Sequence, residues 1–377
     1  MSERHLRLIV AGGGTAGHVL PALAVIEDLQ RQGALDAILW IGSTSGSERA
    51  SAGTADIPFQ AIQTGKLRRY FSLQTATDAG RIPIGIVQAR RLIRRFQPTV
   101  VFSTGGFVSV PTVVAARGLA PILTHEQTAI LGLATRINAR VADTVAVSYE
   151  GTALLAGKLH RHVVVTGNPV RAFLATGDAD RGRARWNFEP ALPFIYVTGG
   201  SLGASPLNQR LAGTLTDLLR HAQVLHQAGA ATSDNDDAAR LRDTRESWPA
   251  DLKQRYQVVE RVGDELPDVY AAADLVVGRA GAGTVAEIAH LGKPAILIPL
   301  PGTGGDEQTK NAQILADAGA AVLIPQAEAT PARLLATILE LLGDRQRLTA
   351  MGAAARSVGR VDAAERLAAE LLALHAR

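Results

Sequence analysis

The sequence predicts an α/β protein with two similar halves, each built on a doubly wound parallel sheet. Short apolar runs of strand length alternate with helical stretches along most of the 377 residues. The first apolar run of each half ends in a loop rich in glycine. The chain is also longer than the roughly 250 to 300 residues at which a single core stops growing, so we expect two domains.

The N-terminal half begins with an apolar run at residues 6–11, which predicts a buried strand. A glycine loop follows at 12–18, and a helix is expected from about Leu20. Further strands are predicted at residues 38–41, 100–103, 122–124, 144–147 and 163–165. Residues 97–116 carry no charge, but Gly105, Gly106 and Pro111 indicate a strand, a loop and a short helix instead of a membrane span.

The C-terminal half repeats this pattern. Strands are predicted at residues 194–197, 223–225, 256–258, 275–277, 295–298 and 321–324. The first of them ends in the glycine loop 199–204, and the fourth runs into a second loop of small residues at 278–283. Residues 168–193 contain three prolines and Gly177, and we expect them to form the hinge between the halves.

Composition excludes several classes of protein. The chain is 47% hydrophobic and 20% charged, which is typical of a soluble globular protein. A net charge of +4 is too small to indicate nucleic acid unless the positive charge is concentrated. No cysteine is present, which excludes disulfides and cysteine-ligated zinc. The polar residues 1–7 run directly into a strand, so no secretory signal is expected.

The loop from Gly278 to Glu287 predicts a nucleotide site. Small residues between a strand and a helix direct backbone N–H groups at whatever lies before the helix, and the helix dipole favours a phosphate there. Glu287 lies about one turn into the helix, where a carboxylate can accept hydrogen bonds from two ribose hydroxyls. The alternative is that Glu287 is only a first-turn acid favoured by the dipole.

The first glycine loop also fits another motif. Gly12, Gly14 and Gly17 match the G-x-G-x-x-G pattern of dinucleotide-binding proteins. The acidic residue that should bind the ribose is missing, because residues 42–44 are Gly-Ser-Thr at the end of the second predicted strand. We therefore do not expect an NAD or FAD site, and no cofactor is predicted.

Two further motifs have simpler interpretations. Gly199, Ser201 and Gly203 match the nucleophile elbow of α/β-hydrolases, but that function leaves the N-terminal half without a task. A phosphate-binding loop uses the same turn more simply. Asp178 and Asp180 form a D-x-D pattern in the predicted hinge, where two acids are usually solvated. No metal site is predicted.

Five motifs, in this order and at these separations, resemble the MurG family of glycosyltransferases: residues 13–24, 125–127, 167–171, 199–204 and 279–287. Members of this family transfer N-acetylglucosamine from UDP-N-acetylglucosamine to undecaprenyl-diphospho-N-acetylmuramoyl-pentapeptide, called lipid I. They act at the cytoplasmic face of the bacterial cell membrane. The resemblance extends over nearly the whole chain, and both substrates are the expected partners.

The resemblance implies the GT-B fold, in which two Rossmann-like domains face a central cleft. Residues 1–170 would form the domain on the acceptor and membrane side, and residues 171–359 would bind the UDP-sugar. A helix within about residues 360–377 would pack back on the first domain.

The resemblance also implies a set of site residues. Thr15, Ala16 and Gly17 would line the cleft, Arg171 and Ser201 would contact the diphosphate, the backbone near Val262 would bind the uracil, and Gln308 would bind the sugar. The phosphate and ribose would be held by Ala282, Gly283, Thr284, Val285, Ala286 and Glu287. Two residues depart from the commonest pattern. Ala16 replaces a glycine, and Thr128 replaces an asparagine, so a contact between residue 128 and the sugar would lose its two N–H donors.

The reaction needs a base for the acceptor hydroxyl and charge stabilisation for the departing UDP. We predict His18 as the base, because a helix N-terminus disfavours the imidazolium and keeps the ring able to accept a proton. Glu126 is the second candidate, and the alternative for His18 is a purely structural role in the loop. Helix N-termini and Arg171 can neutralise the diphosphate without a metal.

Positive charge is concentrated between Lys66 and Arg95, where basic residues alternate with aliphatic and aromatic ones. This pattern is typical of a surface that binds an anionic membrane, although nucleic acid or a solvated helix face would also fit it. The lipid-linked substrate favours the membrane. We expect peripheral association at the cytoplasmic face, and no nucleic acid partner.

Two other functions would keep the same nucleotide loops. One is another UDP-sugar enzyme of this architecture, such as an epimerase or a transferase with a different acceptor. The other is a protein that binds UDP-N-acetylglucosamine without turning it over. Formation of disaccharide and UDP from a lipid I analogue would separate all three.

Overall fold

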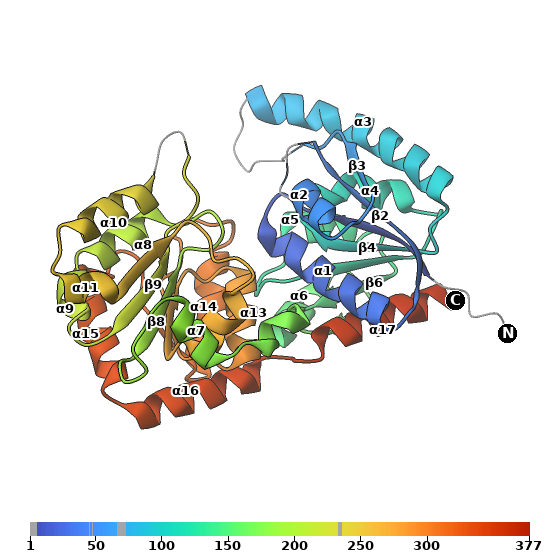
Figure 1. The fold of residues 1–377 in the computed structure, drawn as a ribbon. Helices are drawn as coiled ribbons and strands as arrows, with labels where there is room; N and C mark the ends of the chain where they lie inside the picture. Colours follow the sequence, from blue (N-terminus) through green and yellow to red (C-terminus); the bar gives the residue numbers. More distant parts are fainter. Residues whose placement is uncertain (1–5, 45, 47, 66–72, 233–235) are drawn as a thin grey trace. The chain divides into compact units, whose positions relative to one another are not determined.

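The computed structural model describes residues 6–377, apart from residues 45, 47, 66–72 and 233–235. The chain divides into two compact units. The first unit contains Met1–Arg171 and Val361–Arg377, and the second contains Ala172–Arg360. Each unit has its own parallel sheet and its own core, so each is described by itself (Figure 1).

The first unit contains a parallel sheet with the strand order β3-β2-β1-β4-β5-β6-β7. The chain moves in one direction from β1 to β3 and returns to the other side of β1 with β4, which makes the sheet doubly wound. The strands are β1 (Leu6–Gly12), β2 (Leu35–Ser43), β3 (Phe59–Ile62), β4 (Val100–Gly105), β5 (Ile122–Glu126), β6 (Thr144–Val147) and β7 (Val163–Val165). The sequence analysis missed β3, an edge strand of only four residues.

Helices flank this sheet, and the last of them comes from the end of the chain. They are α1 (Ala16–Arg31), α2 (Glu48–Thr54), α3 (Leu73–Phe96), α4 (Ser109–Ala116), α5 (Leu133–Asn138), α6 (Glu150–Ala156) and α17 (Ala363–His375). Leu367 and Leu371 of α17 are fully buried in one cluster with Val19 and Leu23 of α1. Figure 1 shows α17 in red alongside α1 in blue.

The second unit contains a parallel sheet with the order β10-β9-β8-β11-β12-β13. Its strands are β8 (Phe194–Thr198), β9 (Gln223–Gln227), β10 (Tyr256–Val259), β11 (Leu275–Gly278), β12 (Ala295–Leu297) and β13 (Ala321–Leu323). Its helices are η1 (Ala172–Thr176), α7 (Ala179–Arg185), α8 (Ser205–Ala212), α9 (Leu215–Leu218), α10 (Asp237–Glu246), α11 (Ala250–Gln254), α12 (Leu266–Ala272), α13 (Ala282–Leu291), α14 (Glu307–Asp317), α15 (Pro331–Leu342) and α16 (Arg345–Val358). Both sheets confirm the predicted α/β class.

The predicted hinge at residues 168–193 is wrong in its extent. From residue 172 onward this segment forms η1, α7 and the approach to β8, all within the second unit. Its glycine serves close packing, because a Cβ on Gly177 would lie 2.0 Å from the carbonyl oxygen of Pro267. Asp178 of the D-x-D pattern is the N-cap of α7 and accepts a hydrogen bond from the Arg181 N–H at 2.7 Å.

No helix within the described residues is both long enough and apolar enough to cross a bilayer.

Candidate functional site

The predicted residues of the first unit lie at one edge of its sheet. The strand register pairs Gly12 with Gly105 and Ser103 with Thr124. It also pairs Glu126 with Val147, the last residue of β6. The carboxyl ends of these parallel strands therefore meet at the same edge, as expected for ligand-binding loops in this fold class. The predicted residues lie here: Thr15 precedes α1, Ala16, Gly17 and His18 form its first turn, Glu126 ends β5, and Thr128 lies in the loop after β5.

His18 lies in the first turn of α1, and one of its ring nitrogens is held firmly. Its Nδ1 is 2.9 Å from the carbonyl oxygen of Thr104 and 3.0 Å from Oε1 of Gln127. The Thr104 hydroxyl also donates to the His18 carbonyl at 2.6 Å. These contacts join α1 to the end of β4 and fix the plane of the imidazole.

The other ring nitrogen of His18, Nε2, forms no hydrogen bond with the described residues. It faces Gly106, where a Cβ would lie 3.0 Å from His18 Cδ2 and 3.4 Å from Nε2. Gly106 also has φ +75, a conformation that favours glycine. The glycine keeps this edge of the imidazole uncovered, so Nε2 is the nitrogen that a substrate hydroxyl can reach.

Gln127 belongs to the motif at residues 125–127, but the sequence predicts no role for it. The structure shows it beside His18. It is 1% exposed, and its Nε2 donates to the Thr104 carbonyl at 2.8 Å and lies 3.1 Å from Nδ1 of His125. His125 is fully buried, and its Nε2 is 3.0 Å from the Gly167 carbonyl. Burial lowers the pKa of His125 to about 4, although its hydrogen bond to Gly167 acts in the opposite direction.

Glu126 is 3% exposed, and both of its oxygens are occupied by its own loop. Oε1 accepts from the Thr128 N–H at 3.3 Å and from the Thr128 hydroxyl at 2.9 Å. Oε2 accepts from the Gly132 N–H at 2.9 Å. Thr128 is also buried, and its hydroxyl lies 2.8 Å from the Ile130 carbonyl. Both side chains therefore brace the loop after β5.

Glu48 is a second residue without a role in the sequence analysis. Its carboxylate is fully buried and accepts hydrogen bonds from the Gly14 N–H at 3.0 Å, the Ser43 N–H at 2.8 Å and the Ser43 hydroxyl at 2.6 Å. It thereby ties the first glycine loop to the end of β2. Its sequence signal is weak, because an acid near a helix start usually has only a capping role.

The predicted residues of the second unit also lie at the carboxyl edge of their sheet. The register pairs Thr198 with Gln227 and with Gly278, and Gly278 with Leu297. The loops and helix starts after β8, β10, β11 and β12 therefore gather at this edge. They contain the predicted residues Ser201, Val262, Ala282, Gly283, Thr284, Val285, Ala286, Glu287 and Gln308.

Gln227 connects two of these loops and also had no role in the sequence analysis. Its Nε2 donates to the Gly200 carbonyl at 3.0 Å, and its Oε1 accepts from the Val262 N–H at 2.9 Å. The loop after β8 closes tightly, because a Cβ on Gly203 would lie 2.1 Å from the Ala228 carbonyl and Gly203 has φ +74. Ser201 and Val262 are thus held on either side of one buried amide.

Glu287 lies in the second turn of α13, and a tyrosine orients it. The Tyr270 hydroxyl from α12 donates to Glu287 Oε2 at 2.7 Å. Burial raises the pKa of Glu287 to about 7, and the hydrogen bond from Tyr270 opposes this. Burial raises the pKa of Tyr270 well above its usual value, so it remains a donor at physiological pH. The carboxylate keeps further acceptor positions for ligand hydroxyls.

Gln308 and Arg279 organise the loop after β12. Gln308 Oε1 accepts from the Leu300 N–H at 2.9 Å. Arg279 is 5% exposed and donates from Nη1 to the carbonyls of Ile298 and Pro299 at 2.9 Å and 3.2 Å. Burial lowers the pKa of Arg279 to about 10, so it stays charged. Arg279 therefore has a structural role below the loop.

Arg171 is the last residue of the first unit before the second unit begins. Its Nε donates to Glu27 of α1 at 2.7 Å, and both side chains are more than one third exposed. Arg171 and Ser201 were predicted to contact the same diphosphate, and the structure describes each within its own unit.

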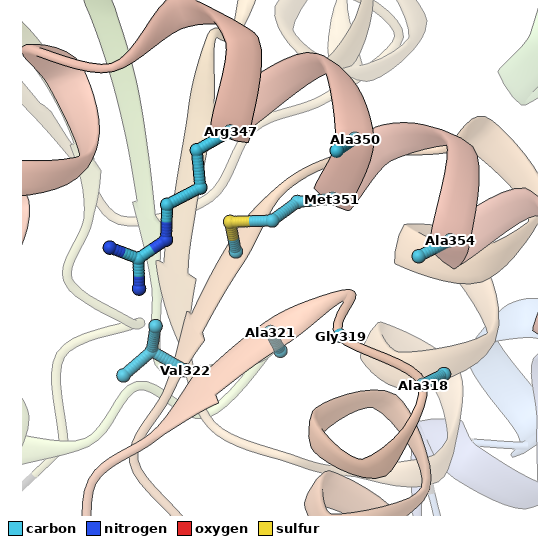
Figure 2. Close-up of a pocket in the computed structure, with 8 residues that line it drawn as sticks. All are labelled: Ala318, Gly319, Ala321, Val322, Arg347, Ala350, Met351 and Ala354. Carbon is cyan, nitrogen blue, oxygen red and sulfur yellow. The ribbon is translucent and has the colours of Figure 1, made fainter.

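Clustered metal ligands and cavities are two other signs of a functional site. No group of three or more His, Cys, Asp or Glu side chains within the described ranges is arranged to hold a metal ion. A pocket of about 450 Å³ lies between β13 and α16 in the second unit (Figure 2). It is lined by alanines, Gly319, Val322, Met351 and Arg347, and by none of the predicted residues.

Both halves of the chain match one known protein family. Residues 8–147 match the glycosyltransferase family 28 N-terminal domain, and residues 194–367 match the glycosyltransferase family 28 C-terminal domain. A protein from Treponema denticola named UDP-N-acetylglucosamine–N-acetylmuramyl-(pentapeptide) pyrophosphoryl-undecaprenol N-acetylglucosamine transferase is 39% identical, over 84% of this chain and 83% of the relative. A protein of the same name from Halalkalibacterium halodurans is 33% identical, over 96% and 98%.

Solved structures show the same architecture. The crystal structure of Acinetobacter baumannii MurG matches with a TM-score of 0.73 and 30% identity, covering 97% of this chain and 99% of that one. A putative UDP-N-acetylglucosamine 2-epimerase from Listeria monocytogenes matches with a TM-score of 0.66 and 14% identity, covering 96% and 93%. The second likeness shows a shared fold alone.

Proposed function

This chain belongs to the MurG family of glycosyltransferases, and we propose that it transfers N-acetylglucosamine from UDP-N-acetylglucosamine to the 4-hydroxyl of lipid I. The product is the β-linked disaccharide of lipid II, formed with inversion at the sugar carbon. The single observation that carries this proposal is the environment of His18, whose Nδ1 is fixed by two oxygens while Nε2 has no partner in the described protein.

His18 acts as the general base. Its Nε2 accepts the proton of the acceptor hydroxyl as that oxygen attacks the sugar carbon and the bond to UDP breaks. Glu126 is less suited to this role, because its oxygens already accept three hydrogen bonds from its own loop. Thr15, Ala16 and Gly17 shape the acceptor side of the site around His18.

The second unit binds the donor. Glu287 accepts hydrogen bonds from the ribose hydroxyls, and Tyr270 holds the carboxylate in position. The backbone at Val262 binds the uracil, and Gln308 contacts the sugar. The N–H groups at the start of α13, from Ala282 to Ala286, bind phosphate with the support of the helix dipole.

The departing diphosphate is neutralised by protein groups. Arg171 and Ser201 contact its oxygens, and a guanidinium can form two parallel hydrogen bonds with a phosphate. The backbone N–H groups of the loops after β8 and β11 also bind the diphosphate. The negative charge that develops on UDP is therefore stabilised as the glycosidic bond breaks.

The protein reaches its lipid acceptor as a peripheral protein at the cytoplasmic face of the bacterial membrane. Helix α3 supports this proposal. Ile84 and Val87 are 53% and 52% exposed, and Arg91 and Arg94 continue the same helix face at a spacing of three and four residues. Apolar and basic groups on one face suit an anionic bilayer. The predicted members from Lys66 to Phe71 lie outside the described residues. Ile86, another predicted member, is partly buried against a core cluster of the first unit and so does not belong to the exposed face.

The experiment that tests the proposed function uses purified protein, UDP-N-acetylglucosamine and a short-chain lipid I analogue, with disaccharide and UDP both measured. We expect stoichiometric formation of the two products. His18→Ala should lower kcat by roughly 10²-fold to 10⁴-fold with little change in donor affinity, since proton transfer occurs only in the transition state. Hydrolysis or epimerisation of the donor without disaccharide would contradict the proposed function. Near-normal turnover by His18→Ala would show that His18 is not the base.

A further inference from the structure

A chain of hydrogen bonds continues inward from His18. It runs from His18 Nδ1 to Gln127 Oε1 at 3.0 Å, from Gln127 Nε2 to His125 Nδ1 at 3.1 Å, and from His125 Nε2 to the Gly167 carbonyl at 3.0 Å. Gln127 and His125 are buried, so water does not compete for these contacts. The direction of each hydrogen bond can be deduced from its partners.

The orientation of the Gln127 amide is fixed by oxygens. Its Nε2 lies 2.8 Å from the Thr104 carbonyl, which can only accept, so that nitrogen must be the donor there. A reversed amide would place Oε1 against the same carbonyl. Oε1 therefore faces His18, and His18 Nδ1 meets two acceptors, Gln127 Oε1 and the Thr104 carbonyl. Nδ1 must carry the hydrogen, which leaves Nε2 of a neutral ring without one.

His125 supports this orientation from the other side. Its Nε2 faces the Gly167 carbonyl, an acceptor, and so carries a hydrogen. Its Nδ1 then accepts from Gln127 in the neutral ring. Burial keeps the pKa of His125 at about 4, so the ring is neutral at physiological pH. A second proton on His125 would oppose the Gln127 amide and favour its reversal.

We infer that Gln127 and His125 are positioning residues for the transfer reaction, which hold His18 in the tautomer whose Nε2 can accept the proton of the sugar hydroxyl. This inference rests on the proposed function, because it takes His18 as the base. Neither residue contacts a reacting atom in this scheme. Both act through the ring of His18.

The first test removes the hydrogen bonds while keeping the size of each side chain. Gln127→Met should lower kcat by about 10-fold to 100-fold, less than the full effect of a general base, with KM for UDP-N-acetylglucosamine unchanged. His125→Leu should have a similar effect. His125→Asn is the matched control, because its Oδ1 can replace Nδ1 as the acceptor for Gln127, and it should retain at least about one third of the wild-type kcat. Thermal unfolding identifies variants that have lost their fold.

The second test separates positioning from general structural damage. If Gln127 acts through His18, Gln127→Met should have no further effect on the residual rate of His18→Ala. A further loss of 10-fold or more in the double variant would overturn the inference. So would equal impairment by His125→Leu and His125→Asn when both are folded.

The third test does not depend on turnover. Long-range ¹H–¹⁵N spectra of histidine-labelled protein report which ring nitrogen carries the hydrogen, and His18→Ala assigns the signals. We expect the Nδ1–H form of His18 in the wild type and a larger share of the Nε2–H form in Gln127→Met, where only the Thr104 carbonyl still accepts from Nδ1. A wild-type ring with hydrogen on Nε2 would overturn the inference even if His18→Ala is inactive. If His18→Ala is active but the spectra agree, the base assignment fails and the hydrogen-bond chain stands.

Discussion

Glu287 gives donor binding a pH dependence that can be measured. Burial raises its pKa to about 7, so below that pH most molecules carry the Glu287 carboxyl in its neutral form. Hydrogen bonds to a charged group stabilise by about 2 to 3 kcal/mol, more than those to a neutral one. We expect affinity for UDP-N-acetylglucosamine to fall between pH 8 and pH 6, and Glu287→Ala to lose about 2 to 3 kcal/mol at pH 8. Calorimetry checks both results, and Glu287→Gln is the control whose affinity should not vary over this range.

The same pKa affects the stability of the protein without ligand. An acid whose pKa rises from 4.5 to about 7 on folding stabilises the folded state fully below pH 4.5. That contribution is lost as pH rises towards 7, at a slope of up to about 1.4 kcal/mol per pH unit. Glu287→Gln lacks this slope. The free energy of unfolding of Glu287→Gln minus that of the wild type should therefore increase as pH rises from 5 to 7. Equal slopes for both proteins in urea titrations would show that Glu287 is solvated and ionised throughout.

The groups that we propose to face a ligand are easier to predict from the sequence than the groups that hold them. His18 and Glu287 follow glycine loops, and that local pattern is visible in the chain. Gln127, Gln227 and Tyr270 act through partners that are distant in sequence, so no local pattern marks them. A glutamine at the carboxyl end of a buried strand was the only available signal for Gln127 and Gln227.

At the scale of elements, α3 carries the prediction for the membrane. Its exposed face combines Ile84 and Val87 with arginines, so binding to vesicles should have an electrostatic part and an apolar part. Salt weakens the first, because surface charges are screened over about 8 Å at physiological ionic strength, and leaves the second. Ile84→Asp with Val87→Asp should reduce sedimentation with anionic vesicles and turnover of a long-chain acceptor. Turnover of a water-soluble acceptor should persist.

The matched control for α3 lies on another helix of the same unit. Leu154 and Leu155 on α6 are 75% and 39% exposed, so Leu154→Asp with Leu155→Asp makes the same change in net charge without touching α3. It should leave vesicle binding unchanged. If this α6 variant weakens binding as much as the α3 variant, net charge alone controls association and α3 is not the docking surface.

Most elements could be predicted because parallel strands buried on both faces are continuous apolar runs. The hinge was mislocated for a physical reason. Proline and glycine are common in turns and flexible linkers. Here Gly177 instead allows the chain before α7 to approach α12 closely, and the sequence alone does not distinguish these two uses of glycine. The edge strand β3 was missed because it is not a continuous apolar run: Gln60 interrupts it, and only Ile62 of its four residues is buried.

At the scale of the whole molecule, the two cores should unfold as separable parts. Leu371 on α17 belongs to the core of the first unit, and Ile338 on α15 to that of the second, and both are fully buried. Truncating a buried leucine or isoleucine to alanine costs about 2 to 5 kcal/mol. Calorimetric scans of Leu371→Ala and Ile338→Ala should each lower a different transition, and UDP-N-acetylglucosamine should raise the one that Ile338→Ala lowers. A single transition shifted equally by both variants would show one cooperative unit.

The position of α17 has a consequence for the newly made chain. The second unit is continuous in sequence, whereas the core of the first unit includes side chains from the last helix. On the ribosome, α1 therefore cannot pack against α17 until the whole second unit has been translated. This takes roughly ten seconds or more at typical rates of about 5 to 20 residues per second. During that time the apolar surface that Leu367 and Leu371 later cover has no native partner from α17. A chaperone that binds this apolar surface of the nascent first unit must therefore leave it before α17 can pack there.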